Sequence, residues 1–358
     1  MRQNSESRAA VTVLGILALG GCNPQREADR EAWVAIAESS RPVKAAGIAA
    51  ADSPVAWRLW WTQQEIYKTD APSELFTGPQ KTDISDRFRR LMCVDESEHR
   101  PLTSQRRPLA GDTSCEAVML NDAAAGYIFK NELWDRRKLI RQAMRDDVHL
   151  PRDSGHVSRE MKTEWRNIQP EQAPRYITAL DDKGHLKGLV AFHLMSHELP
   201  NWLWATWLHE DCSWKMPLEI GFHDSFGANP DKSASDDLKT LLKAKNAEVL
   251  SHYRLIGTQR DFTAPSALGN PMIEGGTADE LRHSSCMGCH AFAAIKDNGY
   301  WNPKPRQTGV PSPPKDFHST DFDFSLTLEA ACLPTLDGPC VVAKLERTWP
   351  FSGMIAKR

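Results

Sequence analysis

The feature that most constrains this 358-residue chain is a cysteine–histidine motif near its C-terminal end. Within "RHSSCMGCHAFAAI" (282–295), Cys286 and Cys289 stand three positions apart and His290 follows directly. With eight cysteines and twelve histidines placed at random, a C-x-x-C-H pattern would occur on the order of 0.006 times in this length. The spacing therefore points to a chemical requirement rather than to chance.

That requirement matches covalent attachment of haem. Two thiols separated by two residues on a helical turn reach the two vinyl groups at one edge of the porphyrin, and the following histidine can bind the iron. We therefore expect one covalent haem c, held by Cys286 and Cys289, with His290 as an axial ligand of the iron. The other side of the iron stays undecided, because a vacant position and four side chains are all candidates: Met354, His318, His283 and Met272.

Other uses of a cysteine pair fit the sequence less well. A thioredoxin-like redox pair follows a buried strand, but "ELRHSS" (280–285) is a polar lead-in. A zinc site needs a second ligand pair close by, and the sequence offers none. A disulfide between Cys286 and Cys289 would be strained.

The N-terminus resembles a bacterial lipoprotein signal. Arg2 and Arg8 precede an apolar run over 11–19, which is too short to span a bilayer. The run ends in "LGGC" (19–22), which resembles a lipobox, in which the cysteine is lipidated and becomes the first mature residue. We expect lipidation at Cys22 and a protein anchored to a bacterial membrane, facing the periplasm, with the outer membrane as the expected location. Haem c is attached in this same compartment.

Export also bears on the remaining cysteines. Thiols outside the cytosol tend to pair. With Cys22 and the motif set aside, five cysteines remain, so at most two disulfides form. Short separations favour Cys93–Cys115 and Cys332–Cys340 and leave Cys212, although sequence cannot fix the connectivity.

The pattern along the chain predicts an α+β fold with four parts: a signal peptide (1–21), a polar tether with one short helical segment (22–50), a mixed helical and antiparallel β region (51–265), and a small, mainly helical, loop-rich, cytochrome c-like haem segment (266–358). Within the third part, we expect helices over 54–69 and 234–255, and one or two over 117–147 after a capping box at Thr113–Glu116. A hairpin over 175–195 is followed by a strand in "NWLWATWLHED" (201–211).

Composition excludes little beyond nucleic acid as a partner. The formal net charge of −3 gives no basic surface for nucleic acid. Tryptophan is unusually frequent, with 12 copies, and we interpret these rings as core or sheet-face residues rather than as a stacking platform.

Three further histidine patterns have structural interpretations. "HLMSHE" (193–198) spaces two histidines by four, but in a strand they would stand about 13 Å apart, too far to share a metal ion. "HED" (209–211) and "HDSFG" (223–227) could hold an acid–base pair, although turn and cap chemistry is favoured.

Beyond the motif, the chain resembles bacterial monohaem c-type cytochrome lipoproteins of largely unassigned role. The matching stretches, within about 160–330, are "KTEWR" (162–166), "LPNWLWATWLHED" (199–211), "YRLIGTQRDF" (253–262), "GNPMIE" (269–274) and "SSCMGCH" (284–290). The resemblance implies one haem c per chain and a large non-haem region before it. It carries over only Cys286, Cys289 and His290.

These features favour a membrane-tethered periplasmic cytochrome that transfers single electrons to periplasmic redox proteins. A haem-dependent oxidoreductase, in which region 51–265 binds the substrate, is an alternative. That region is larger than an electron carrier needs and lies within the usual size range of a domain. A haem-containing sensor or structural lipoprotein is the third hypothesis.

Overall fold

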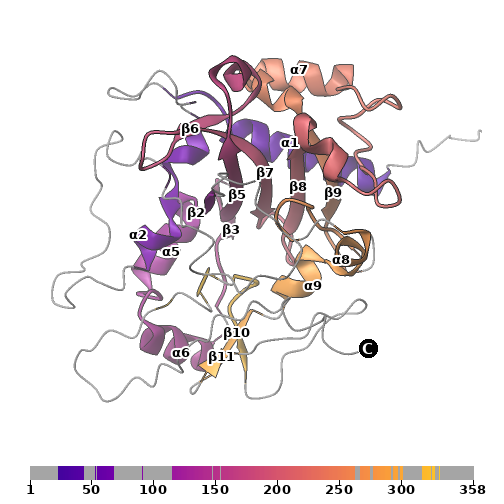
Figure 1. Cartoon of the computed structure of the whole chain (residues 1–358). Helices are drawn as coiled ribbons and strands as arrows, with labels where there is room; N and C mark the ends of the chain where they lie inside the picture. The colour runs from indigo at the N-terminus through magenta and orange to yellow at the C-terminus, as the bar shows by residue number, and fades with distance from the viewer. Residues whose placement is uncertain are drawn as a thin grey trace, which may run out of the picture.

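An antiparallel sheet organises the protein (Figure 1). The computed structural model describes residues 23–43, 53, 55–67, 91, 115–146, 148–153, 155–262, 267–274, 277–291, 293–296, 299–300, 317–323, 325–326 and 330. Over these residues, helices combine with antiparallel strands, which confirms the α+β prediction.

Seven strands of the described chain form the main sheet. Along the sheet the order is β1 (Trp61–Thr62), β2 (Cys115–Leu120), β5 (Arg159–Asn167), β7 (Leu186–Ser196), β8 (Leu203–His209) and β9 (Tyr253–Gln259), and β6 (Thr178–Leu180) pairs with β7. Two smaller sheets consist of β3 (Arg152–Asp153) with β4 (His156–Val157), and of β11 (Gly299–Tyr300), β10 (Ala294–Lys296) and β12 (His318–Ser319).

Helices connect and cover the strands. The α-helices of the described chain are α1 (Pro24–Ser39), α2 (Gln63–Ile66), α5 (Asp122–Lys130), α6 (Arg136–Arg145), α7 (Asp236–Lys245), α8 (Ala278–His283) and α9 (Cys286–His290). Short 3-10 helices are η1 (Ala56–Leu59), η2 (Pro170–Arg175), η3 (Glu210–Lys215) and η4 (Glu248–His252). None of the helices described is long and apolar enough to cross a membrane.

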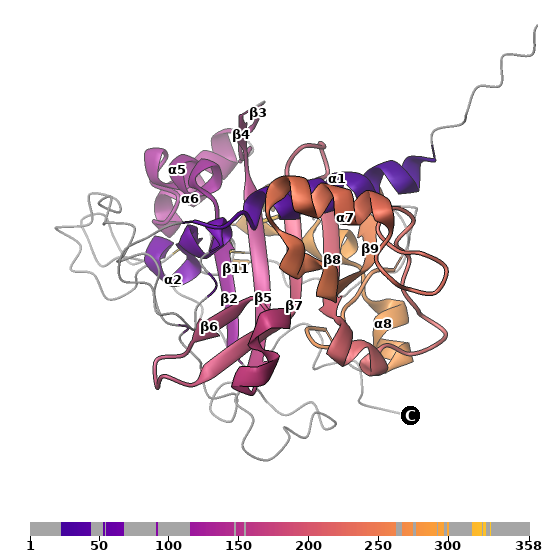
Figure 2. The ribbon, with the colours of Figure 1, turned by 90° about the horizontal axis from the view of Figure 1, so that it is seen from above.

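The main sheet is covered on both faces. Helices α1 and α7 lie across one face (Figure 2), where Trp165, Phe192 and Trp207 belong to the same apolar cluster as α1. On the other face, Trp204 shares a cluster with α5, α6 and Met287 of α9. Since neither face is open to water, all seven residues of β8 are buried.

The expected tether over 22–50 is wrong for its described part, because α1 is a packed helix of 16 residues. Asn23 caps it, with its side chain accepting from two backbone N–H groups of the first turn. Trp33 is fully buried and donates to Asp224 at 2.9 Å. The buried Asp29 carboxylate accepts from Thr258 and from Ser225, each at 2.7 Å. Buried hydrogen bonds of this kind make α1 part of the folded body.

Several local predictions are also wrong. Two helices, α5 and α6, do lie within 117–147 as predicted, but the expected cap is wrong: Cys115 begins strand β2, which pairs with β5 over its whole length, and α5 is capped by Asn121. The helix expected over 234–255 ends at Lys245, because Asn246 adopts a left-handed conformation (φ 53°) that terminates α7. In place of the helix expected over 54–69, the described residues 55–67 form two single-turn helices around the short strand β1. Strands β5 and β9 had no sequence prediction.

Other predictions are confirmed. Strands β6 and β7 pair as the expected antiparallel hairpin, and β8 follows as the third strand. The core interpretation of tryptophan holds for most of the described rings, since seven are buried: Trp33, Trp57, Trp61, Trp165, Trp202, Trp204 and Trp207. Trp214 is the exposed exception, with 73% of its surface accessible.

Candidate cofactor-attachment site

The C-x-x-C-H motif forms a single helical turn that is fixed to the main sheet. Ser285 caps α9 by accepting from the Gly288 N–H at 3.0 Å. The Met287 N–H donates to the side chain of Gln259, the last residue of β9, at 3.1 Å. Met287 itself is fully buried. The motif therefore does not stand apart from the preceding region, because it packs on the main sheet.

Gly269 allows its chain segment to lie close against Ser284, just before helix α9. The chain at Leu268 pairs with Ser284 through a backbone hydrogen bond of 2.8 Å. A Cβ atom at Gly269 would lie 2.7 Å from the Ser284 Cβ. A side chain at 269 would therefore push α9 away from its place on the sheet.

Both motif thiols are partly accessible and neither is in a disulfide. Burial, with a smaller contribution from the Glu274 carboxylate, raises the pKa of Cys289 to about 12 and that of Cys286 well above its usual range. Reactive dithiols need a lowered pKa, and here the preceding element is helix α8 rather than a strand. Both observations argue against a thioredoxin-like pair.

His290 is oriented as an iron ligand requires. Its Nδ1 lies 2.9 Å from the backbone carbonyl oxygen of Phe322, which can only accept a hydrogen bond. The proton of the neutral ring therefore sits on Nδ1, and the lone pair sits on Nε2. Burial lowers the pKa of His290 to about 4, so the ring is neutral at pH 7. Metal-binding histidines commonly have one ring nitrogen held by such an acceptor.

The ring of His290 also rests on an aromatic neighbour. Trp204, on β8, has its ring centroid 4.6 Å from that of His290. Together with the Phe322 carbonyl, this contact restricts the imidazole to one orientation. Two thiols on one turn and an oriented, neutral imidazole form a donor set that fits haem c.

The Phe322 carbonyl is presented by an unusual turn. Asp321 and Phe322 both have positive φ, at 57° and 65°, a conformation that costs on the order of 1–3 kcal/mol for each non-glycine residue. The turn is held because the Asp321 carboxylate accepts from the Leu150 N–H at 2.6 Å and Thr320 donates its N–H to Ala293. Two of the six described non-glycine residues with positive φ therefore lie in the turn that holds the motif histidine.

Buried carboxyl groups surround this turn. Burial raises the pKa of Asp323 to about 7 and the pKa of Asp321 and of Glu160 above their usual values. Ser325 donates to Glu160 at 3.3 Å. Burial lowers the pKa of His197, which faces Asp321 at 3.7 Å. The carboxyl groups of Asp321, Asp323 and Glu160 are thus held nearer their neutral form.

Replacing Asp323 by Asn should change how stability depends on pH. A carboxyl with a folded pKa near 7 and an unfolded value of about 3.9 binds its proton more tightly in the folded state. The contribution of Asp323 to stability is therefore fully present below about pH 4 and is lost as pH rises towards 7, by at most about 1.4 kcal/mol per pH unit. Urea unfolding from pH 4 to 8 measures this: the free energy of unfolding of Asp323→Asn should rise relative to that of the wild type as the pH increases.

A matched variant controls this measurement. Asp236→Asn, at the exposed start of α7, should follow the wild type at every pH. A stability difference between Asp323→Asn and the wild type that does not change with pH would contradict the prediction.

The "HED" and "HDSFG" patterns have the structural roles expected of them. His209 is buried and stacks on Tyr176 with ring centroids 3.6 Å apart. Burial lowers its pKa to about 4. Asp224 accepts from the Phe226 N–H at 3.0 Å within its own turn. His197 stacks on Trp202 just after the end of β7, whereas His193 lies within that strand.

No group of three or more metal-ligating side chains converges among the described residues. The three described candidates for the sixth ligand lie in different parts of the chain. Met272 packs in the cluster that also contacts Cys286, His283 is near Asp279 at the exposed end of α8, and His318 lies in β12. Met354 lies outside the described residues.

The remaining cysteine predictions are only partly covered. Cys115 is disulfide-bonded, as expected, and Cys212 is outside any disulfide, also as expected. Cys22, Cys93, Cys332 and Cys340 lie outside the described residues.

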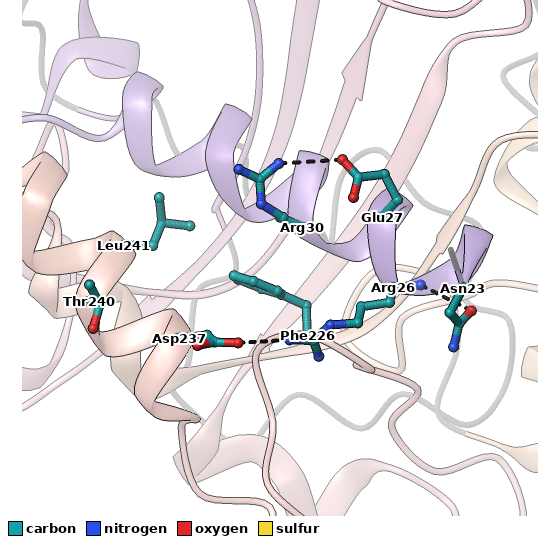
Figure 3. Close-up of a pocket in the computed structure, with 8 residues that line it drawn as sticks. All are labelled: Asn23, Arg26, Glu27, Arg30, Phe226, Asp237, Thr240 and Leu241. Atoms are coloured by element: carbon teal, nitrogen blue, oxygen red, sulfur yellow. Dashed lines mark hydrogen bonds and ion pairs between the residues drawn. The ribbon is translucent and has the colours of Figure 1, made fainter. Parts of the chain in front are cut away.

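A groove of about 640 Å³ lies between α1 and α7 (Figure 3), on the sheet face opposite α9. Its charged residues bind one another: Arg26 pairs with Asp237 at 2.7 Å and Arg30 with Glu27 at 3.4 Å. The other lining residues are Asn23, Phe226, Thr240 and Leu241. The groove is separate from the motif, and its ion pairs leave it without an evident ligand.

Sequence reasoning missed the residues that support the motif. Phe322, Trp204 and Gln259 lie far from Cys286 or His290 in sequence, so no local pattern reveals their roles. Glu274 stands in "GNPMIE", one of the stretches quoted above for the resemblance, and this was the only sequence feature that drew attention to it.

Comparison with family models, curated proteins and solved structures finds no match to the chain.

Proposed function

We propose that the protein binds one haem c and transfers single electrons. Cys286 and Cys289 would hold the porphyrin through thioether bonds, and His290 would bind the iron through Nε2. The proposal is supported chiefly by the hydrogen bond of His290 Nδ1 to the Phe322 carbonyl, which leaves the lone pair on Nε2. When bound, the haem supplies an iron centre that cycles between ferric and ferrous states.

We also propose that the chain is a bacterial lipoprotein facing the periplasm, anchored through Cys22 in the outer membrane, with periplasmic redox proteins as partners. The position of α1 changes what such an anchor implies. Because Asn23 already caps α1, at most one residue separates Cys22 from the folded body. The folded body would then lie close to the lipid surface instead of on a flexible tether.

A Cys22→Ala variant tests the anchor. We expect it to leave the membrane fraction or to retain its signal peptide, because the acyl chains that hold a lipoprotein need this thiol. Fractionation with immunoblotting and intact mass measures both results. Cys212→Ala, which removes a thiol outside any disulfide, serves as the control. Unchanged membrane association and unchanged mass of Cys22→Ala would contradict the lipoprotein proposal.

A haem-dependent oxidoreductase is the second candidate, and one observation favours it. His193, Lys162 and Glu274 all act electrostatically on His290, so charged and polar side chains gather beside the motif. An outer-sphere electron carrier has no need of such groups. Adding carbon monoxide to the reduced protein separates the candidates. A shift of the absorption spectrum indicates an accessible iron and favours the enzyme, and an unchanged spectrum favours the carrier.

A further inference from the structure

The register of the main sheet places a row of polar residues next to the motif. Across β9, β8, β7 and β5, the paired residues are Gly257, Thr206, His193 and Lys162. Side chains of directly paired residues on one face stand about 4.5–5.5 Å apart at their Cβ atoms. The Lys162 side chain also forms an ion pair with Glu116 of β2, at 3.1 Å. His193 thus has charged and hydroxyl neighbours in the sheet.

The loop over 268–274 crosses this row strand by strand. Leu268 lies over Gly257, where an added Cβ would be 3.3 Å from its side chain. Asn270 donates to the Thr206 hydroxyl at 2.9 Å, and Glu274 lies 2.7 Å from His193 Nε2. The same Glu274 carboxylate accepts from the Asn270 N–H. The loop therefore fixes the carboxylate on His193.

Helix α9 crosses the neighbouring row. That row contains Gln259 and Trp204, which pair directly, and these are the residues that contact Met287 and His290. The two rows are two residues apart along each strand, a spacing of about 6.5–7 Å. His193 and Glu274 therefore lie beside the motif, which agrees with the electrostatic influence of Glu274 on Cys289 and His290 and of His193 on His290.

The ring of His193 is held at one nitrogen only. Glu274 accepts from Nε2, so in the neutral ring the lone pair is on Nδ1. His193 Nδ1 is buried and has no hydrogen-bond partner among the described residues. A buried polar atom without a partner costs about 1–3 kcal/mol, which suits an atom that acts on a bound molecule.

We propose that His193, oriented by Glu274, accepts the proton of a small neutral molecule that must lose a proton in order to bind beside the haem. Hydrogen cyanide and hydrogen peroxide are molecules of this class. With hydrogen cyanide, the H–C bond breaks, the proton passes to the lone pair of Nδ1, the cyanide anion becomes the bound species, and no electron is transferred. This inference rests on the proposed haem attachment and develops the second candidate function.

The test compares two ligands on the oxidised protein: hydrogen cyanide, which must lose a proton, and imidazole, which binds as a neutral molecule. Association rates are followed by the Soret band in the wild type and in His193→Gln. We expect cyanide association to slow by at least about 100-fold in the variant, the scale of positioned proton transfer. Imidazole association should change little.

The chain offers a matched control. His252 lies 2.7 Å from Glu210, an equivalent histidine–carboxylate pair joined to the other end of the sheet. His252→Gln should bind cyanide at the wild-type rate. If His193→Gln does not fold, Glu274→Gln tests the same arrangement with the imidazole in place, and cyanide association should again be slower than in the wild type.

Equal cyanide rates in the wild type and His193→Gln, or equal slowing of cyanide and imidazole, would overturn this inference. A wild-type protein whose spectrum responds to neither ligand would overturn it too. Each of these leaves the haem attachment intact, whereas a wild-type chain without covalent haem would overturn the attachment itself, and the pyridine haemochrome spectrum identifies that case.

Discussion

Replacing both Cys286 and Cys289 by serine is expected to abolish covalent haem attachment completely. The thioether bonds require sulfur, and both thiols are partly accessible, outside any disulfide and on a single helical turn. The variants are produced together with a haem c maturation system. Haem-stained denaturing gels and the haem left after acidic acetone extraction measure the result. Each single serine variant should keep one thioether, with a haemochrome band shifted to longer wavelength by the remaining vinyl group.

Cys212→Ser provides the matched control, because Cys212 is likewise outside any disulfide but belongs to η3. It should carry haem as the wild type does. Haem that survives extraction in the double serine variant would contradict the assignment of these two thiols.

Trp33→Ala is expected to lower the free energy of unfolding by about 3–5 kcal/mol, the usual cost of truncating a buried tryptophan. Trp33 is fully buried, packs edge-on against Trp207 with ring centroids 5.7 Å apart, and donates to Asp224. The alanine would leave a cavity between α1 and the sheet and remove a hydrogen bond from the partly buried Asp224 carboxylate. Chemical denaturation measures the change.

Arg30→Ala, on the exposed side of α1, should change the stability by less than about 0.5 kcal/mol. An equally small effect of Trp33→Ala would mean that α1 is not part of the core. In that case, residues 23–39 would act as the tether first expected from their polar sequence.

The sequence predicted those elements whose signals are local. The β6–β7 hairpin has a turn rich in Asp and Gly, and β8 is a run of apolar and aromatic residues. Strand β5, "REMKTEWRN", has charged residues on one side because that side lines the polar row beside the motif. Met161, Thr163 and Trp165 alternate with these charged residues, so a period-2 pattern is present in this strand, which pairs with neighbours on both edges. The α1 prediction failed because the buried stripe of this helix includes the charged residue Asp29.

The residues of the candidate site likewise divide into those with a local sequence signal and those without one. Cys286, Cys289 and His290 are contiguous, so their chemistry is readable from spacing alone. The groups that orient them are not, because Phe322 is 32 residues beyond His290 and its contact depends on a strained turn. The pair of His193 and Glu274 depends on the register of β7 and on the path of the loop over 268–274.

The measurement that tests the central proposal most directly is the pyridine haemochrome spectrum of the purified wild-type chain, with mass spectrometry of the peptide spanning residues 282–295. We expect a c-type spectrum that persists after acidic acetone extraction, and a peptide whose mass is increased by one haem. A peptide of unmodified mass, or haem that is entirely removed by extraction, would contradict the proposal that Cys286, Cys289 and His290 bind haem c.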